Sequence, residues 1–254
     1  NQGAHPDRDP FVDATLNNLG FAWWLPVDHG NEVQTDSVQF DIGFYAEQSR
    51  HNEGGGMGGL IPTRTGEGWV KQEVNFNGTA TESAFGRGRF GDNDGGTDAP
   101  YEVAVGDDPN SSGGYTGVGY GWTSGDTVPW TFSYDASNDE ATFTLDGSTA
   151  GPRSLPDQPD GRIGIQTKAD EATISVDEVT LTMDGQQAHL SGPNNVTASN
   201  DDAGGGNGSD GRDLQYLVMN TDLDGQTSFT VSGNVTVTVQ GDYDGSEEGV
   251  AFDV

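Results

Sequence analysis

Apolar and polar residues alternate along much of this chain, and this period of two constrains its fold more than any other feature. The longest candidate strand, residues 33–52, places Val38, Phe40 and Ile42 on one face with polar residues or glycine between them. No segment has a convincing helical period. Roughly a dozen or more such strands predict an all-β protein, a jelly-roll-like antiparallel β-sandwich with long Gly/Asp-rich loops.

The same segment carries a family resemblance. Residues 40–48 read Phe-Asp-Ile-Gly-Phe-Tyr-Ala-Glu-Gln, and Arg50-His51-Asn52 and a glycine-rich turn follow. This stretch resembles the anchoring strand of secreted TasA/camelysin-like proteins, as found in halophilic archaea. The resemblance covers about the first fifth of the chain. It implies an exported β-sandwich subunit of a kind that builds extracellular fibres by lending a terminal strand to the next subunit. The family's export signal does not precede Asn1, and we interpret this as removal during export.

Several local expectations follow from the patterning. Residues 130–134 and 141–145 predict a hairpin, and a change of phase at Asp177-Glu178 predicts a bulge. The succession of alternating strands and turns in residues 130–179 is similar to that of concanavalin-like jelly rolls. This resemblance concerns the fold alone. Glycine-rich composition predicts long loops at 52–68 and 86–96, a strand at 68–76 between them, and an exposed loop at 194–212.

The N-terminal residues predict an extended arm, residues 1–16, ahead of a body that spans 17–254 with a soft boundary near 123–129. Pro6 and Pro10 disfavour packing at the start of the arm. The second part of the arm is a candidate donor strand, which could pair with the sheet edge of a neighbouring copy. Pairing within its own sheet is the alternative, and the alternating run 250–254 is a second candidate donor. The residues expected in the donor strand are Phe11, Val12, Ala14 and Leu16.

Charge and cysteine content exclude several classes of function. The net charge is −31, which suits concentrated salt because the Debye length falls to about 3 Å at 1 M. A chain with so few basic residues cannot neutralise phosphates, so nucleic acids and anionic membranes are not expected partners. The chain has no cysteine and no apolar run of transmembrane length, so disulfides, thiolate chemistry and a membrane span are not expected.

The motifs give little support for catalysis. Gly86-Arg87-Gly88-Arg89-Phe90-Gly91 matches a dinucleotide-binding pattern, but no helix follows it, so a dinucleotide site is not expected. The sequence also lacks G-x-S-x-G, H-E-x-x-H and the paired-carboxylate strand pattern of some jelly-roll glycosidases, so we do not expect an enzyme. The acidic stretch that comes next could hold Ca²⁺ through Asp92, Asp94 and Asp98. Calcium is a possible cofactor rather than a required one. Weaker calcium candidates are the turns 222–225 and 242–245.

Two hypotheses of different class remain. The first is a structural subunit of an extracellular, cell-surface filament, a homopolymer assembled by donor-strand complementation. The second is a surface adhesin or carbohydrate-binding module that stacks glycans on tryptophan rings, with Trp23, Trp122 and Trp130 as candidates. Glycosylation is expected on a surface protein, and the sequence contains N-x-S/T sequons at Asn77, Asn110, Asn195, Asn207 and Asn234.

Overall fold

The computed structural model describes residues 60–70, 84–90, 102–108, 113–201, 206, 208, 211–240 and 250–254, all within one compact unit, Met57–Val254. None of these residues lies in a helix long and apolar enough to cross a membrane. They form two sheets in which most neighbouring strands are antiparallel, so the predicted all-β sandwich is confirmed. The jelly-roll connection order, the arm 1–16 and the domain division stay predictions.

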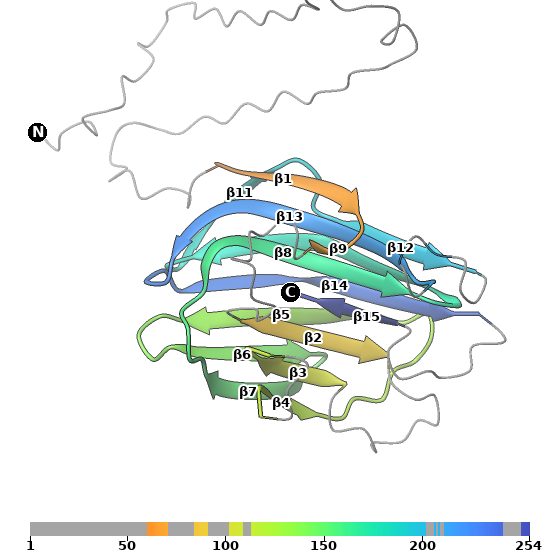
Figure 1. Ribbon diagram of the computed structural model, residues 1–254, viewed down its shortest axis with the longest axis horizontal. Helices are drawn as coiled ribbons and strands as arrows, with labels where there is room; N and C mark the ends of the chain where they lie inside the picture. The colour runs from red at the N-terminus through yellow and green to blue at the C-terminus, as the bar shows by residue number, and fades with distance from the viewer. Residues whose placement is uncertain are drawn as a thin grey trace, which may run out of the picture. The chain divides into compact units, whose positions relative to one another are not determined.

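One layer is an eight-stranded sheet with the strand order β11-β1-β13-β8-β15-β2-β3-β4 (Figure 1). β1 and β11 pair in parallel, and the other neighbours pair antiparallel. The strands are β1 (Leu60–Glu67), β2 (Phe85–Phe90), β3 (Val103–Gly106), β4 (Tyr115–Val118), β8 (Asp160–Ala169), β11 (His189–Ser191), β13 (Asp213–Asp224) and β15 (Val250–Asp253).

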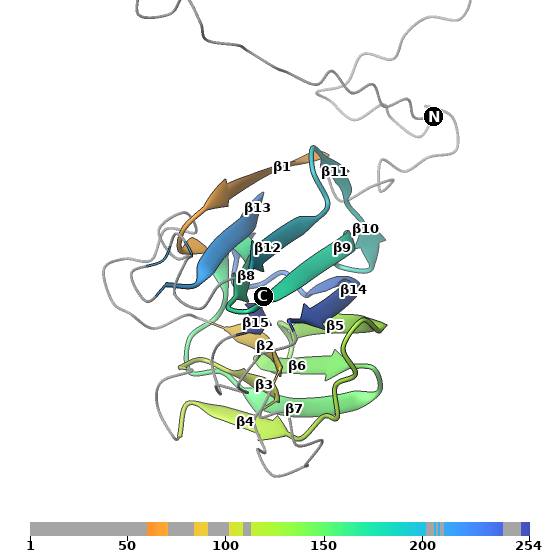
Figure 2. The ribbon, with the colours of Figure 1, turned by 90° about the vertical axis from the view of Figure 1, so that its right-hand side faces the viewer.

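The second layer is a seven-stranded sheet with the order β10-β9-β14-β5-β6-β7, and β12 pairs with β9 off this path. Figure 2 shows the two layers from the side. The strands are β5 (Thr127–Asp135), β6 (Glu140–Leu145), β7 (Ser148–Ser154), β9 (Ala172–Met183), β10 (Gln186–Gln187), β12 (Val196–Asn200) and β14 (Phe229–Val239).

The core lies between the layers and is built from the alternate residues of each strand. On β5, for example, Val128, Trp130, Phe132 and Tyr134 are buried, whereas the residues between them are half-buried or exposed. Aromatic rings from both sheets meet here, since the ring centroids of Trp130 and Phe252 lie 5.4 Å apart. Aromatic contacts of this kind bury large apolar areas and therefore dominate the stability of the sandwich.

The hairpin and the bulge in the second sheet are confirmed. β5 and β6 pair antiparallel from Trp130 to Asp135, and the carboxylate of Asp135 accepts hydrogen bonds in the connecting turn. In β9, the register against β14 shifts beside Glu178, which has a φ of 54°. A left-handed residue at the position of a register shift is typical of a β-bulge.

The dinucleotide-like glycine motif is a strand, so the prediction of a loop at 86–96 was wrong for its first half. β2 pairs with β15 on one side and with β3 on the other. A Cβ on Gly86 would lie 2.6 Å from the Phe143 ring, and one on Gly88 would overlap the Phe252 ring. These glycines therefore make room for core aromatics, and β2 lacks the β-branched residues that identify a strand in sequence.

Other boundaries also differ from expectation. β1 occupies most of the predicted loop 52–68, and β12 lies within the predicted loop 194–212. Gly68, Trp69 and Val70 are not in a strand, so the predicted strand 68–76 does not begin at Gly68. Instead, the backbone N–H of Val70 donates to the Gln166 side chain on the outer face of β8.

The last strand in chain order, β15, lies in the middle of the eight-stranded sheet. It pairs antiparallel with β8 on one side and with β2 on the other. The predicted strand at 250–254 is thus confirmed, and it completes its own sheet. Its donation to a neighbouring copy stays an alternative prediction.

Candidate functional site

The edge strand β4 is the candidate assembly site in the described part of the chain. β4 ends the eight-stranded sheet, and its four residues include neither a charged residue nor a proline. Proteins commonly protect edge strands from pairing by these two residue types or by making the edge very short. β4 lacks the first two of these protections and is four residues long.

The other described edges are better protected. β7 contains Pro152 and Arg153, and β1 beyond β11 contains Arg64 and Glu67. β11 and β10 are only three and two residues long. On β12, the carboxylate of Asp213 accepts a hydrogen bond from the backbone N–H of Ser199 at 2.8 Å. By residue type and length, β4 is therefore the described edge best suited to strand addition.

Side chains at both ends hold β4 in place. At its start, Arg153 of β7 donates to the carbonyl of Gly113 and to Asp107, and the N–H of Asp107 donates to the Gly114 carbonyl. At its end, the buried carboxylate of Glu102 accepts from the backbone N–H of Tyr120. The edge is therefore preformed, and an added strand would not have to order it first.

Many of the predicted site residues lie outside the described residues. These are the donor-strand residues Phe11, Val12, Ala14 and Leu16, the calcium candidates Asp92, Asp94 and Asp98, and the sequons at Asn77, Asn110 and Asn207. Their roles stay predictions.

Two sequons are described, and they differ in accessibility. Asn195 is exposed just before β12. Asn234 is half-buried in the middle of β14, and its amide donates to the Glu178 carboxylate at 2.8 Å. Asn195 is therefore the more accessible of the two, and glycosylation of either stays a prediction.

In the described turn at 222–225 the Asp224 carboxylate is engaged in hydrogen bonds within the turn, and calcium binding there stays a prediction. The Asp224 carboxylate accepts hydrogen bonds from the N–H of Gln226 and the hydroxyl of Thr227, and these bonds lower its pKa. No group of three or more His, Asp or Glu side chains that could hold a metal occurs among the described residues. The turn 242–245 lies outside them.

The tryptophans that could stack on glycans are engaged in the sandwich where they are described. Trp130 is 1% exposed, so it cannot meet a glycan from solution. The indole N–H of half-buried Trp122 donates to the Arg89 carbonyl at 2.7 Å, and its ring packs against Tyr120 and Phe90. Trp23 lies outside the described residues.

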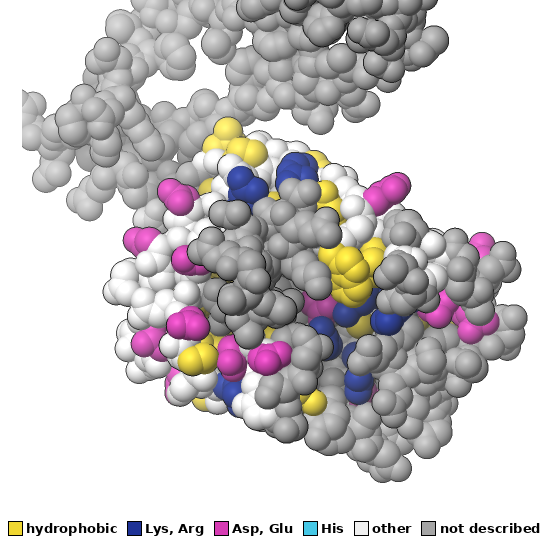
Figure 3. Space-filling view, viewed as in Figure 1, with side chains coloured by type: hydrophobic (Ala, Val, Ile, Leu, Met, Phe, Trp, Pro, Cys, Tyr) yellow, Lys and Arg dark blue, Asp and Glu magenta, His cyan; other side chains and the backbone are white. Residues whose placement is uncertain are grey.

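A charged cluster on the outer face of the eight-stranded sheet was not predicted. Asp253 of β15 pairs with Arg87 of β2 and, at 2.7 Å, with Lys168 of β8. The cluster therefore ties β15 to both of its neighbours. Figure 3 views this face, where basic side chains are visible beside hydrophobic ones. The sequence signal was the pair Arg87 and Arg89 alternating with the inward glycines of β2.

The pKa values in the cluster reflect its burial and its ion pairs. Burial raises the pKa of the Asp253 carboxyl, but the charges and hydrogen bonds of Arg87 and Lys168 outweigh this effect and lower the pKa to about 2. Burial also lowers the pKa of Lys168, and the charge of Asp253 opposes that change. A carboxylate held by two cations is a poor general base at neutral pH.

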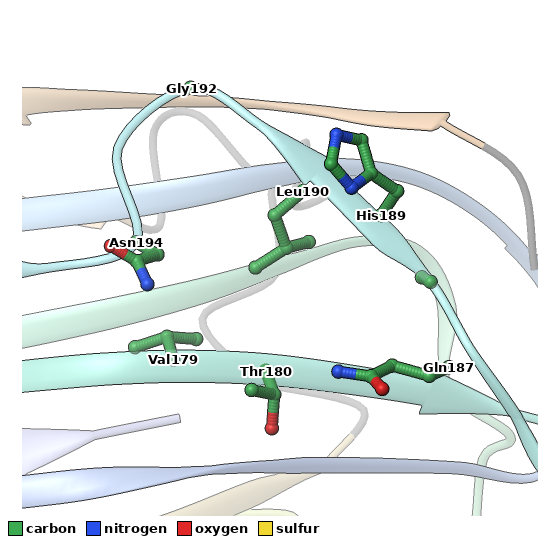
Figure 4. Close-up of a pocket in the computed structure, with 8 residues that line it drawn as sticks. Val179, Thr180, Gln187, His189, Leu190, Gly192 and Asn194 are labelled. Atoms are coloured by element: carbon green, nitrogen blue, oxygen red, sulfur yellow. The ribbon is translucent and has the colours of Figure 1, made fainter. Parts of the chain in front are cut away.

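A shallow pocket of about 370 Å³ lies between β9 and the segment that contains β11 (Figure 4). Val179 and Thr180 of β9 form one side, and His189, Leu190 and Asn194 lie opposite. None of its lining residues is acidic. The pocket therefore lacks the carboxylate pair that glycoside hydrolysis requires.

A comparison with known protein families found no match, and neither did a search of curated proteins.

Proposed function

We propose that this protein is a structural subunit of an extracellular, cell-surface filament, in which a strand from one copy extends the eight-stranded sheet of the next copy at β4. The observation that supports this most is the edge of β4, which has no charge and no proline and is fixed at both ends. Main-chain hydrogen bonds supply most of the affinity when a strand is added to an edge.

The donor in this proposal is the strand at 11–16. Its residues Val12, Ala14 and Leu16 share one face, which would turn toward the interior of the sandwich beside half-buried Val118. Because the donor and the acceptor are different surfaces, each copy retains one of each. Contacts of this head-to-tail kind produce open fibres when they do not close into a ring.

Electron microscopy of negatively stained protein in about 3 M KCl, where charges are strongly screened, tests the proposal. The key variant is Thr116→Lys, which places a charge on the edge of β4. Its matched control is Thr65→Lys, at an exposed position of β1. A second variant lacks residues 1–16. We expect fibres from the unmodified chain and from Thr65→Lys, and discrete particles from the other two.

Circular dichroism should show the same β-sheet content in all four proteins, so that loss of fibres is not loss of folding. Fibres formed by Thr116→Lys would contradict addition at β4. Discrete particles of the unmodified chain would contradict the filament itself and favour the adhesin.

A further inference from the structure

The inward side of β4 is less covered than that of the neighbouring strand β3. β4 and β7 end the two sheets on the same side of the sandwich (Figure 2). Val103 and Val105 of β3 are fully buried. Their register partners on β4 are Val118, which is half-buried, and Thr116, which is exposed. An added strand would therefore cover apolar surface of Val118 that is still in contact with water.

Main-chain groups also face the open edge. Along an antiparallel strand, residues that bond to one neighbouring strand alternate with residues that bond to the other. The N–H of Asp107 donates to the Gly114 carbonyl at 2.9 Å, so the even-numbered residues of β4 bond back to β3. Gly117, and Gly119 just after the strand, therefore direct their N–H and C=O groups away from β3. These are the groups with which an added strand would pair.

Fixed side chains stand at both ends of this open stretch. Arg153 of β7 donates to the Gly113 carbonyl, so this carbonyl already has a donor. At the other end, the N–H of Tyr120 donates to the Glu102 carboxylate, which keeps position 120 beside the start of β3. The Tyr120 ring packs against the core, and its hydroxyl donates to Asp146 at 3.0 Å. Tyr120 is therefore a large and well-held side chain on the path of an added strand.

The apolar face of the donor strand has one small residue between two larger ones. Val12, Ala14 and Leu16 share this face, and a slip of one residue would turn all three to solvent. The register can therefore change only in steps of two. Forcing a larger side chain against a held one costs about 1–3 kcal/mol, so the small residue is favoured opposite Tyr120. This argument holds for parallel and antiparallel addition, because Ala14 is the central residue.

We propose that the added strand lies with Ala14 of one copy directly opposite Tyr120 of the next, so that Tyr120 sets the register. This inference rests on the filament function proposed above. In this register, Val12 or Leu16 packs beside Val118, and the main chain of the donor pairs with Gly117 and Gly119. Tyr120 thus acts as a positioning residue that selects where the strand binds along the edge.

Cysteine pairs measure the register directly, because the chain has no cysteine of its own. Ala14→Cys protein is assembled in about 3 M KCl with an equal amount of Tyr120→Cys, Val118→Cys or Thr116→Cys protein, and copper phenanthroline is added as the oxidant. Directly opposite residues have Cα atoms about 4.5–5.5 Å apart, whereas diagonal neighbours are about 7–8 Å apart, too far for a disulfide. We expect disulfide-linked dimers with Tyr120→Cys at least about tenfold faster than with the other two.

A pair of size changes tests the packing itself. Ala14→Phe should abolish the fibres seen by electron microscopy, and Tyr120→Ala in the same chain should restore them, whereas Val118→Ala should not. Fibres without a preferred disulfide at Tyr120→Cys would overturn this register and leave the filament standing, and so would fibres of Ala14→Phe alone. Discrete particles of the unmodified chain would overturn the filament and the register together. The two failures therefore give different results.

Discussion

The ion pairs of Asp253 fix β15 at the scale of single residues. Asp253→Asn would leave buried Lys168 and half-buried Arg87 without their shared carboxylate. Because Asp253 and Arg87 are half-buried, the loss is smaller than for a fully buried ion pair, and we expect the free energy of unfolding to fall by about 1–3 kcal/mol at pH 7. Asp222→Asn, at an exposed position of β13, is the control and should change little. Urea denaturation in concentrated KCl measures the free energy of unfolding of both variants. An equally small decrease in the two would show that the Asp253 ion pairs contribute nothing to stability.

The same variant has a defined pH dependence. The pKa of Asp253 is about 2 in the folded protein and about 3.9 in an unfolded chain. Since the folded pKa is the lower one, the carboxylate stabilises the fold above about pH 4, and this stabilisation is lost as the pH falls toward about 2. The difference in unfolding free energy between the unmodified chain and Asp253→Asn should therefore shrink over this range.

A second residue-scale prediction concerns Gly88 of β2. An alanine there would overlap the buried Phe252 ring, which packs against Trp130 and Phe143 and has little room to move. Overpacking of this kind costs about 1–3 kcal/mol. Gly121→Ala is the control, because nothing lies within 4 Å of its added Cβ. Thermal unfolding should show a lower midpoint for Gly88→Ala alone, and Phe252→Leu in the same chain should restore part of the loss.

At the scale of elements, the sequence predicted the strands that alternate clearly and missed those that do not. β5, β6 and β9 have large apolar residues at every second position, so their pattern is visible without a structure. β2 was not predicted because Gly86 and Gly88 occupy its inward positions. Aromatic side chains from β5, β6 and β15 fill the space there. A single strand does not reveal which residues from other strands will face it.

The candidate site was predictable only in part, for the same reason. The sequence indicated a donor with alternating apolar residues, but an acceptor edge depends on strand order, which local patterning does not determine. The Asp253 cluster likewise joins residues 166 positions apart in the chain. The serine and threonine residues on the outer face of the seven-stranded sheet are scattered along the sequence, and only the register of several strands brings them into rows.

At the scale of the whole molecule, charge should make stability depend strongly on salt. A net charge of −31 produces repulsion that extends over about 10 Å at 0.1 M salt and about 3 Å at 1 M. Repulsion disfavours the compact state. The midpoint temperature of thermal unfolding should therefore rise as the KCl concentration increases from about 0.1 to about 3 M. Fluorescence of the buried Trp130 can follow unfolding.

The size of this effect separates charge screening from a general effect of solutes. Sucrose also stabilises folded proteins, by exclusion from their surface, but it does not screen charge. If screening dominates, most of the gain in midpoint should occur by about 1 M KCl, where the Debye length has already fallen to about 3 Å. A steady rise up to about 3 M that sucrose reproduces would instead assign the salt dependence to exclusion from the surface, and the acidic composition would then have to be explained by solubility.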